Sequence, residues 1–283
     1  MNGMNVNVTC SIFPKFYKHL DVEGLAALVK QIGCDTANLV IRDGYWVTPG
    51  GLADEAPKFV EAMRAAGLAV EFATAGFAFE DIIADDTPLK ILADCGITAF
   101  RPAYFRKVVD GDVRGSLDAA RATMEKVADV CLKIGVRCVY QIHHGTLVSS
   151  ASSVWPIVKG LDPKAVGVML DPGNQVHEGM ENWLRSCQLL GEYLAAAGIK
   201  DVAIVRDGAK VSEPQKGWKR EWVPCDEGVT DWYAFVRGLK AVEFDGTFVF
   251  MPFYDSDDPD KMTEKLTREV AYVRSVVEAV AVE

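Results

Sequence analysis

Residues 165–174 read AVGVMLDPGN, an unbroken apolar run that stops at Asp171-Pro172-Gly173-Asn174. A parallel strand that is buried on both faces has this composition, because neither face needs polar residues. The proline and glycine that follow favour a turn or the first turn of a helix. The stretch therefore predicts a buried parallel strand with polar side chains at its carboxyl end.

The same unit recurs along the chain, since short apolar runs alternate with segments of helical period. The predicted strands cover residues 5–10, 37–41, 68–74, 97–101, 136–142, 165–170, 201–205 and 247–251. The predicted helices cover residues 22–32, 54–66, 88–95, 114–134, 153–160, 181–197, 230–241 and 259–279. Eight strand–helix units in 283 residues predict a single (β/α)8 TIM barrel that spans residues 1–283.

A doubly wound open sheet is the main alternative fold. It needs a switch point in its strand order and usually carries a glycine-rich phosphate-binding fingerprint. Neither G-x-G-x-x-G nor G-x-x-x-x-G-K-[ST] occurs in the chain, which favours the barrel.

The composition is that of a folded globular protein, with 49% hydrophobic and 25% charged residues. The net charge of −10 disfavours nucleic-acid binding but leaves room for a local basic pocket for a small anion. Seven cysteines without a C-x-x-C pair, no leader-like start and no long apolar run predict a reduced, cytoplasmic protein with no membrane partner.

In such a barrel the reacting groups lie at the carboxyl ends of the strands, which form its mouth. Polar residues follow most of the predicted strands, namely Arg42, Arg101, Tyr104, Gln141, His143, His144, Asp171, Asn174, His177, Arg206 and Tyr254. Neighbouring strand residues point to opposite sides, so His143, in phase with Gln141, is expected to face the pocket instead of His144.

Residues 207–228 form the longest irregular stretch and contain Trp218 and Trp222. Two interpretations stay open, a lid over the mouth or a surface excursion with aromatic residues folded back. His143, Asp171 and Arg206 are expected to converge on one cavity at the carboxyl ends of the strands, beside this stretch.

Several motifs, taken in order, resemble the xylose-isomerase-like superfamily of sugar isomerases and epimerases. Gln141-Ile-His143-His-Gly-Thr is similar to its Glu-x-His-Gly-Gly-Thr motif, and Val-Met-Leu-Asp171-Pro-Gly-Asn174 to its strand-six Asp motif. Similar stretches also follow for its His-x-Lys-Asp motif (Val-Ala-Ile-Val-Arg206-Asp207), its Pro-x-Gly-x-Gly-x-x-Asp-Trp motif (residues 222–232) and its last strand (residues 244–251). The resemblance implies a TIM barrel with sugar-type chemistry.

Members of this superfamily hold a divalent cation through Glu, Asp, His and Glu from strands five to eight. The resemblance places these positions at Gln141, Asp171, Ile204 and Met251, of which only Asp171 is kept. An aliphatic side chain and a thioether cannot replace hard donors for Mg²⁺ or Mn²⁺, so we expect no cofactor and no usual metal site. Two alternatives stay open: a Zn²⁺ or Fe²⁺ site rebuilt from Asp171, His143 and His177, or a metal held by Asp171, Gln141 and His143.

The first functional hypothesis is an enzyme that moves a proton next to a carbonyl of a sugar-like substrate without the usual metal. It needs a base and a group that holds the developing oxyanion. The candidate catalytic residues are His143, Asp171, His177 and Arg206. The candidate substrate-binding residues are Gln141, Arg42, Arg101, Tyr104, Asn174, Trp218 and Tyr254.

Two further hypotheses stay open. The missing glutamates also favour a non-catalytic carbohydrate-binding protein or subunit. A metal-dependent isomerase, dehydratase or lyase with an altered ligand set is the third. In each case the expected partner is a small sugar-like molecule, and the resemblance also implies a homodimer.

Overall fold

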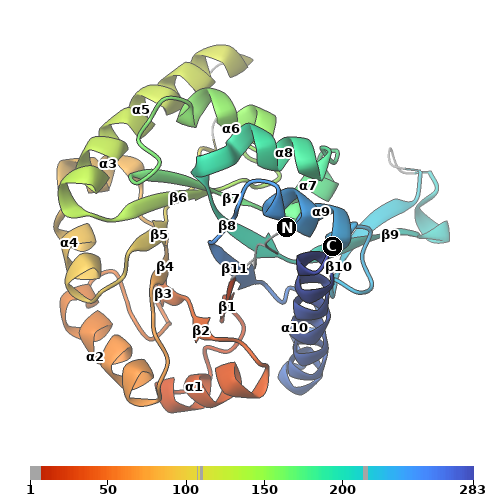
Figure 1. Cartoon of the computed structure of the whole chain (residues 1–283), viewed down its shortest axis with the longest axis horizontal. Coiled ribbons are helices and arrows are strands. Elements are labelled where there is room, and N and C mark those ends of the chain that lie inside the picture. The colour runs from red at the N-terminus through yellow and green to blue at the C-terminus, as the bar shows by residue number, and fades with distance from the viewer. Residues whose placement is uncertain (1–7, 107, 109–110, 213–215) are drawn as a thin grey trace.

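The computed structural model describes residues 8–106, 108, 111–212 and 216–283, so residues 5–7 of the first predicted strand lie outside the described part. Figure 1 shows strands surrounded by an outer ring of helices. The strands of the main sheet are β1 (Thr9–Ile12), β2 (Thr36–Ala37), β3 (Leu39–Ile41), β4 (Phe72–Ala75), β5 (Ala99–Arg101), β6 (Arg137–Gln141), β7 (Val166–Leu170), β8 (Leu194–Ile199) and β11 (Thr247–Phe250).

The sheet closes into a barrel. Its order is β2-β1-β11-β8-β7-β6-β5-β4-β3, and every pairing is parallel. The two ends of that order, β2 and β3, are separated in sequence by Asn38 alone, so one continuous stretch of chain joins both edges. The predicted TIM barrel is confirmed, and the open-sheet alternative is wrong.

The helices connect successive strands on the outside of the barrel (Figure 1). They are α1 (Val22–Gln31), α2 (Leu52–Ala65), α3 (Phe79–Ala84), α4 (Thr87–Asp94), α5 (Val113–Ile134), α6 (Ala151–Val158), α7 (Pro172–His177), α8 (Trp183–Leu190), α9 (Trp232–Lys240) and α10 (Pro259–Ala281). Sequence analysis did not predict α3 and α7, which are short helices in the loops at the mouth.

The prediction of barrel strand seven is wrong. That strand is β8 (Leu194–Ile199), which falls largely within the predicted helix 181–197. The predicted strand 201–205 does form, as β9 (Asp201–Arg206), but it pairs antiparallel with β10 (Trp218–Val223) in a separate two-stranded sheet. This hairpin projects from the side of the barrel (Figure 1), and its second arm occupies part of the stretch expected to be irregular.

Side chains alternate between the barrel interior and the helix-facing side, as the pleat requires. The interior holds a separate apolar cluster of Phe13, Val40, Phe72, Val139, Met169, Ala196, Val249 and Met251. A polar group also lies inside: the Ser11 hydroxyl donates to Asn38 at 2.6 Å, and Asn38 donates to Thr74 at 3.2 Å. These bonds satisfy Asn38 where the strand is interrupted.

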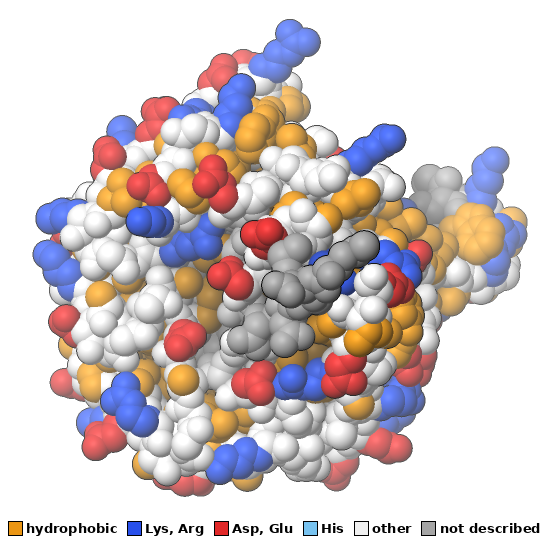
Figure 2. All heavy atoms as spheres, in the orientation of Figure 1, with side chains coloured by type: hydrophobic (Ala, Val, Ile, Leu, Met, Phe, Trp, Pro, Cys, Tyr) orange, Lys and Arg blue, Asp and Glu red, His pale blue; other side chains and the backbone are white. Residues whose placement is uncertain are grey.

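The face shown in Figure 2 carries acidic and basic side chains interspersed around its periphery. No helix in the described residues is both long and apolar enough to span a bilayer.

Glu269 is a fully buried carboxyl group between α10 and the barrel. It accepts hydrogen bonds from the Cys225 backbone N–H at 2.9 Å and the Tyr254 hydroxyl at 2.8 Å. Burial nevertheless raises the pKa of Glu269 to about 7. Between pH 4.5 and pH 7, Glu269 is therefore protonated in the folded protein and ionised in the unfolded chain.

The free energy of unfolding should consequently be highest below pH 4.5 as far as Glu269 is concerned, and should fall as the pH rises through 7. A shift of this size corresponds to about 3 kcal/mol. Glu269→Gln should flatten this slope between pH 5 and pH 8, because Gln can accept from Cys225 and donate to the Tyr254 oxygen. Urea unfolding at both pH values measures it, with the exposed Glu278→Gln on the same helix as control. An unchanged slope in Glu269→Gln would assign the effect to another group.

Candidate functional site

Five side chains at the carboxyl ends of adjacent strands form what we call the mouth layer: Arg101, Gln141, Asp171, Lys200 and Met251. All five are buried. Their inward direction follows from strand phase. In β8, for example, Ala196 belongs to the interior cluster, so Gly198 and Lys200 lie on the same face.

Asp171 lies at the centre of this layer and is 0% exposed. It is the N-cap residue of α7, and its Oδ1 accepts from the Asn174 backbone N–H at 2.9 Å. Its Oδ2 accepts from the Asn174 side-chain amide at 2.7 Å and from Gln141 Nε2 at 2.5 Å. The capping interaction thus fixes a carboxylate in the buried mouth layer, where burial would otherwise make it costly.

Lys200 supplies the opposite charge. Its Nζ lies 3.3 Å from Asp171 Oδ2 and donates to Asn174 Oδ1 at 3.2 Å, while its side chain is 4% exposed. The ammonium also lies over the rings of Trp222 and Phe253, at 4.6 and 5.0 Å from their centroids. Burial lowers the pKa of Lys200, and the Asp171 carboxylate opposes that shift. Asp171 and Asn174 occupy two of its three N–H donors, which leaves one for a ligand.

Gln141 connects the charged pair to the rest of the mouth. Its Oε1 accepts from the Tyr104 hydroxyl at 2.8 Å, which orients the amide so that Nε2 faces Asp171. The same nitrogen lies 3.5 Å from Met251 Sδ, a weak acceptor. The predicted substrate-binding residues Gln141, Tyr104 and Asn174 therefore belong to one hydrogen-bonded network around Asp171.

Aromatic and imidazole rings form a row across the mouth. Successive ring centroids lie 4.7 Å apart from Tyr104 to His143, 4.6 Å to His144, 4.2 Å to His177 and 4.8 Å to Trp222. The expectation that only His143 would face the site is wrong, because β6 ends at Gln141 and strand alternation does not extend into the following turn.

Hydrogen bonds assign the protons of two of these histidines. His143 Nδ1 lies 2.7 Å from the His144 carbonyl oxygen, which can only accept, so Nδ1 carries the proton and Nε2 keeps its lone pair. His144 Nδ1 lies 2.7 Å from Asn174 Oδ1. The amide nitrogen of Asn174 donates to Ile142 O and to Asp171, which fixes Oδ1 as an acceptor, so His144 Nδ1 also carries the proton. The pKa values of His143 and His177 are both lowered to about 4, mainly by burial, and nearby positive charges contribute to the shift of His177. His143 is therefore a neutral base at neutral pH.

The row does not bring His143, His177 and Asp171 to one point. Stacked imidazoles hold their lone pairs in parallel planes, so a single ion cannot lie in the plane of each ring. Within the described part of the chain there is no group of three or more His, Cys, Asp or Glu residues arranged to hold a metal.

Arg206, Ile204 and Trp218 lie on the projecting hairpin and not in the mouth layer. Ile204 and Trp218 are 41% and 49% exposed, and the Arg206 guanidinium lies 4.8 Å from the Trp218 ring. The expected convergence of Arg206 with His143 and Asp171 is therefore contradicted, because β9 leaves the barrel directly after Lys200. The predicted mouth residue Tyr254 is also placed elsewhere, since it is buried with its hydroxyl bonded to Glu269.

The other two predicted arginines do line the mouth. Arg101 is 7% exposed, donates to the Pro102 carbonyl at 3.0 Å and lies 4.9 Å from the Tyr104 ring. Burial lowers the pKa of Arg101. Arg42 is exposed and lies 5.7 Å from the Tyr45 ring.

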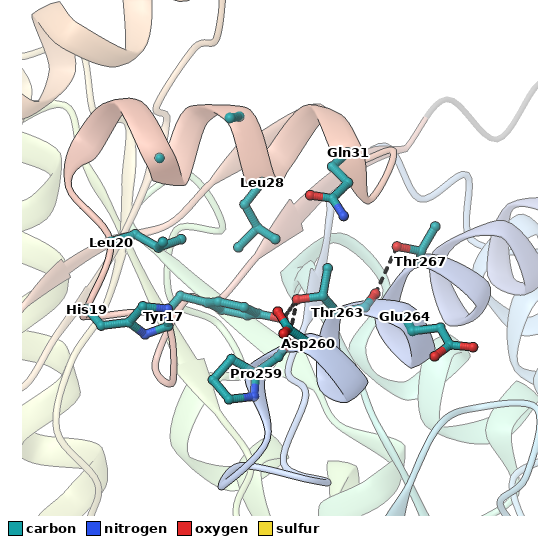
Figure 3. Close-up of a pocket in the computed structure, with 12 residues that line it drawn as sticks. Tyr17, His19, Leu20, Leu28, Gln31, Pro259, Asp260, Thr263, Glu264 and Thr267 are labelled. Atoms are coloured by element: carbon teal, nitrogen blue, oxygen red, sulfur yellow. Dashed lines mark hydrogen bonds between the residues drawn. The ribbon is translucent and has the colours of Figure 1, made fainter.

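A cavity of about 560 Å³ lies elsewhere, between α1 and α10. Figure 3 shows Tyr17 pointing across it to Thr263, with their hydroxyl oxygens 2.9 Å apart. Its acidic lining residues, Asp260 and Glu264, are exposed. Buried groups of opposite charge meet at the mouth and not in this cavity, so we place the candidate site at the mouth.

Comparison with known proteins agrees with this geometry. Residues 26–274 match the family model described as xylose isomerase-like TIM barrel. The chain belongs to this family. No curated protein matches it by sequence.

Three solved structures illustrate the structural similarity. A D-psicose 3-epimerase, studied with D-fructose, has a TM-score of 0.70 and 14% identity over 95% of this chain and 99% of its own. A 3-keto-D-glucoside 4-epimerase from E. coli has a TM-score of 0.67 and 14% identity, with 95% and 100% covered. A xylose isomerase-like protein from Mycobacterium smegmatis, in complex with magnesium, has a TM-score of 0.67 and 17% identity, with 95% and 100% covered.

The true barrel strand changes one ligand position of the family pattern. The end of β8 reads Gly198-Ile199-Lys200-Asp201 and fits the last two residues of His-x-Lys-Asp, which places the histidine position at Gly198 and not at Ile204. A Cβ atom on Gly198 would lie 2.8 Å from Asp171 Oδ2. This position therefore points into the site and is empty of any side chain.

Lys200, Trp222 and Phe253 belong to the site but were not among the predicted site residues. The Lys-Asp pair at 200–201 is the available signal, but the predicted helix 181–197 covers the first four residues of β8 and hides the strand that ends there. Trp222 reaches the mouth because Gly173 allows it close: a Cβ there would lie 3.1 Å from the indole.

The contribution of His143 and His177 to stability should decrease as the pH falls from 6.5 to 4, because both are neutral in the folded protein and become protonated in the unfolded chain. This contribution is opposite in sign to that of Glu269. His177 Nε2 is buried and has no hydrogen-bond partner among the residues that the structure describes. His177→Phe keeps a ring between His144 and Trp222, so it should reduce the acid-induced loss without lowering the free energy of unfolding at pH 7. Chemical denaturation at pH 4.5 and 7 tests this. The exposed His19→Phe is the control, and an equal response of both variants would contradict the assignment.

Proposed function

We propose that this barrel catalyses proton transfer next to the carbonyl group of a sugar-like substrate without a divalent metal. The observation that carries the proposal is the buried ion pair between Lys200 and Asp171 in the mouth layer. The pair supplies a fixed positive charge that could stabilise a developing oxyanion, and a neutral histidine lies beside the same network.

The residues at the family's ligand positions do not fit a divalent metal. Gln141 offers an amide, Gly198 no side chain and Met251 a thioether, so Asp171 is the single carboxylate. The Lys200 ammonium already lies 3.3 Å from that carboxylate and would repel a second cation.

The residues divide the chemistry as follows. The free N–H of Lys200 donates to the substrate oxygen, with the Arg101 guanidinium nearby adding positive charge. His143 Nε2 accepts the proton from the adjacent carbon and returns it, to the same or to the neighbouring carbon, so the reaction is an isomerisation or epimerisation with no net change in protons. Asp171, Gln141 and Asn174 position Lys200 and do not touch the substrate.

A non-catalytic carbohydrate-binding protein remains the second candidate, because Gln141 and Met251 replace the family's two glutamates. An NMR assay in D₂O distinguishes the enzyme from the non-catalytic protein. It follows the exchange of carbon-bound hydrogen for deuterium in a panel of ketoses and aldoses. Binding without exchange across the panel would support the second candidate. A cytoplasmic location, a homodimer and the lack of nucleic-acid and membrane partners stay predictions.

Lys200→Met should lower the free energy of unfolding by about 3–5 kcal/mol, because it leaves Asp171 as an unpaired buried charge. Adding Asp171→Asn should recover most of that loss, since the amide is neutral. The double variant should be folded and still lack exchange activity, which isolates the role of Lys200 from its effect on stability. Urea unfolding and the exchange assay measure both. Full activity of the double variant would rule out Lys200 as the charge-stabilising group.

Mn²⁺ should not raise the melting temperature of the wild type, and EDTA should not change its exchange activity. The combination Gln141→Glu, Lys200→Met and Met251→Glu removes the competing ammonium and supplies two carboxylates beside Asp171, while Gly198 is kept because a Cβ there would lie 2.8 Å from Asp171 Oδ2. This variant should respond to Mn²⁺, because a ligand that binds only the folded state stabilises it. Elemental analysis of the purified wild type completes the test, and a stoichiometric metal would show that the altered-ligand alternative is correct.

A further inference from the structure

Five basic residues surround the mouth, although the protein as a whole carries a net charge of −10. They follow four different barrel strands, so the closure of the barrel and not local sequence brings them together. They are Lys15, Arg42, Arg101, Arg106 and Lys200.

Shared aromatic rings show how closely the lysines approach each other. The ammonium groups of Lys15 and Lys200 lie 4.7 and 5.0 Å from the centroid of the same Phe253 ring. The Lys15 carbonyl oxygen accepts from the Tyr45 hydroxyl at 2.9 Å, and the Arg42 guanidinium lies 5.7 Å from the Tyr45 ring. Lys15, Arg42 and Lys200 therefore form one connected group.

The remaining two cations meet at the ring of Tyr104. The guanidinium groups of Arg101 and Arg106 lie 4.9 and 5.5 Å from the centroid of Tyr104. The Tyr104 hydroxyl donates to Gln141, which donates to Asp171. Both groups of cations thus adjoin the mouth layer.

The acidic residues nearby do not balance this charge. Among the residues that the structure describes, Asp171 pairs with Lys200, and no carboxylate forms an ion pair with any of the other four cations. Asp43 and Glu178 are exposed, and Glu178 accepts from the Gly145 backbone N–H. Asp201 is bonded to Thr230 and Trp232, and Asp255 to Lys261 and Lys265.

The clustering has an electrostatic consequence for Lys15. Burial lowers the pKa of Lys15, and repulsion from Arg42 and Lys200 lowers it further. Ring faces attract these cations but leave their N–H groups without acceptors of full negative charge. An anion that joins this excess of positive charge is attracted by several cations at once.

We propose that the mouth binds an anionic sugar derivative, whose carboxylate or phosphate group is held by Lys15 and Arg42 on the side of the mouth next to Lys200. The sugar-like part of the ligand rests on the proposed function, and the anionic part rests on the cations alone. Arginine and lysine are the side chains that bind carboxylate and phosphate oxygens most strongly.

Calorimetric titration of the full chain at pH 7.5 tests the proposal with matched probes. D-glucuronate is compared with D-glucose, D-fructose 6-phosphate with D-fructose, and inorganic phosphate is titrated alone. At least one anionic sugar should bind about tenfold or more tightly than its neutral partner, and the ratio should shrink in high salt. The pair that shows the effect distinguishes a carboxylate from a phosphate.

The variant Lys15→Met/Arg42→Met should bring the anionic and neutral affinities to within about twofold, while its melting temperature shows that it is folded. The control Lys30→Met/Arg185→Met removes two exposed cations from α1 and α8 and should keep the wild-type ratio. Equal binding of anionic and neutral probes by the wild type would overturn the proposal. An unchanged ratio in Lys15→Met/Arg42→Met, or no binding of either anionic sugar or of phosphate, would overturn it too.

These outcomes are independent of those that test catalysis. Selective anion binding without hydrogen exchange would retain this inference and refute the proposed enzyme. Hydrogen exchange on neutral sugars, with no preference for anionic ligands, would support the proposed enzyme and refute this inference.

Discussion

The ion pair of Lys200 and Asp171 is the constraint on which the arrangement of the mouth depends. Neither charge is exposed enough for water to stabilise it, so each needs the other and a complete set of hydrogen bonds. The chain meets this requirement with neighbouring strands. Asp171 follows β7, Lys200 follows β8, and Asn174 bridges them by donating to Asp171 while accepting from Lys200.

Space for the pair comes from small residues in β8. Ala196 and Gly198 point inward below Lys200, and any side chain at 198 would collide with the Asp171 carboxylate. The same small residues explain why β8 was not predicted as a strand. Leu194–Ile199 contains three consecutive alanines, and alanine has the highest intrinsic helix propensity, so local preference indicated a helix. Pairing on both sides, with β7 and β11, overrides that preference.

Most of the fold and part of the site could be predicted because position along a strand determines position in the barrel. Once β6 and β7 were located, Gln141, Asp171 and Asn174 followed as residues of the mouth. The error at strand seven had a different cause. The chain offers two strand-forming segments in succession, and period alone cannot show which one enters the barrel and which forms the hairpin. Choosing β9 placed Ile204 and Arg206 in the site and left Lys200 out. Trp222 and Phe253 could not be predicted, because loops and a hairpin carry them into the mouth.

The number of positive charges at the mouth determines which kind of substrate it favours. In the function we propose, one ammonium takes the place that a divalent cation has in related proteins, and it brings half the charge. It also cannot coordinate a substrate oxygen and can only donate a hydrogen bond to it. The additional positive charge of Arg101, Lys15 and Arg42 compensates for this difference at a distance, through charge and not through coordination. A substrate that carries its own negative group gains from all of these cations at once, whereas a neutral sugar gains only from the single free donor of Lys200.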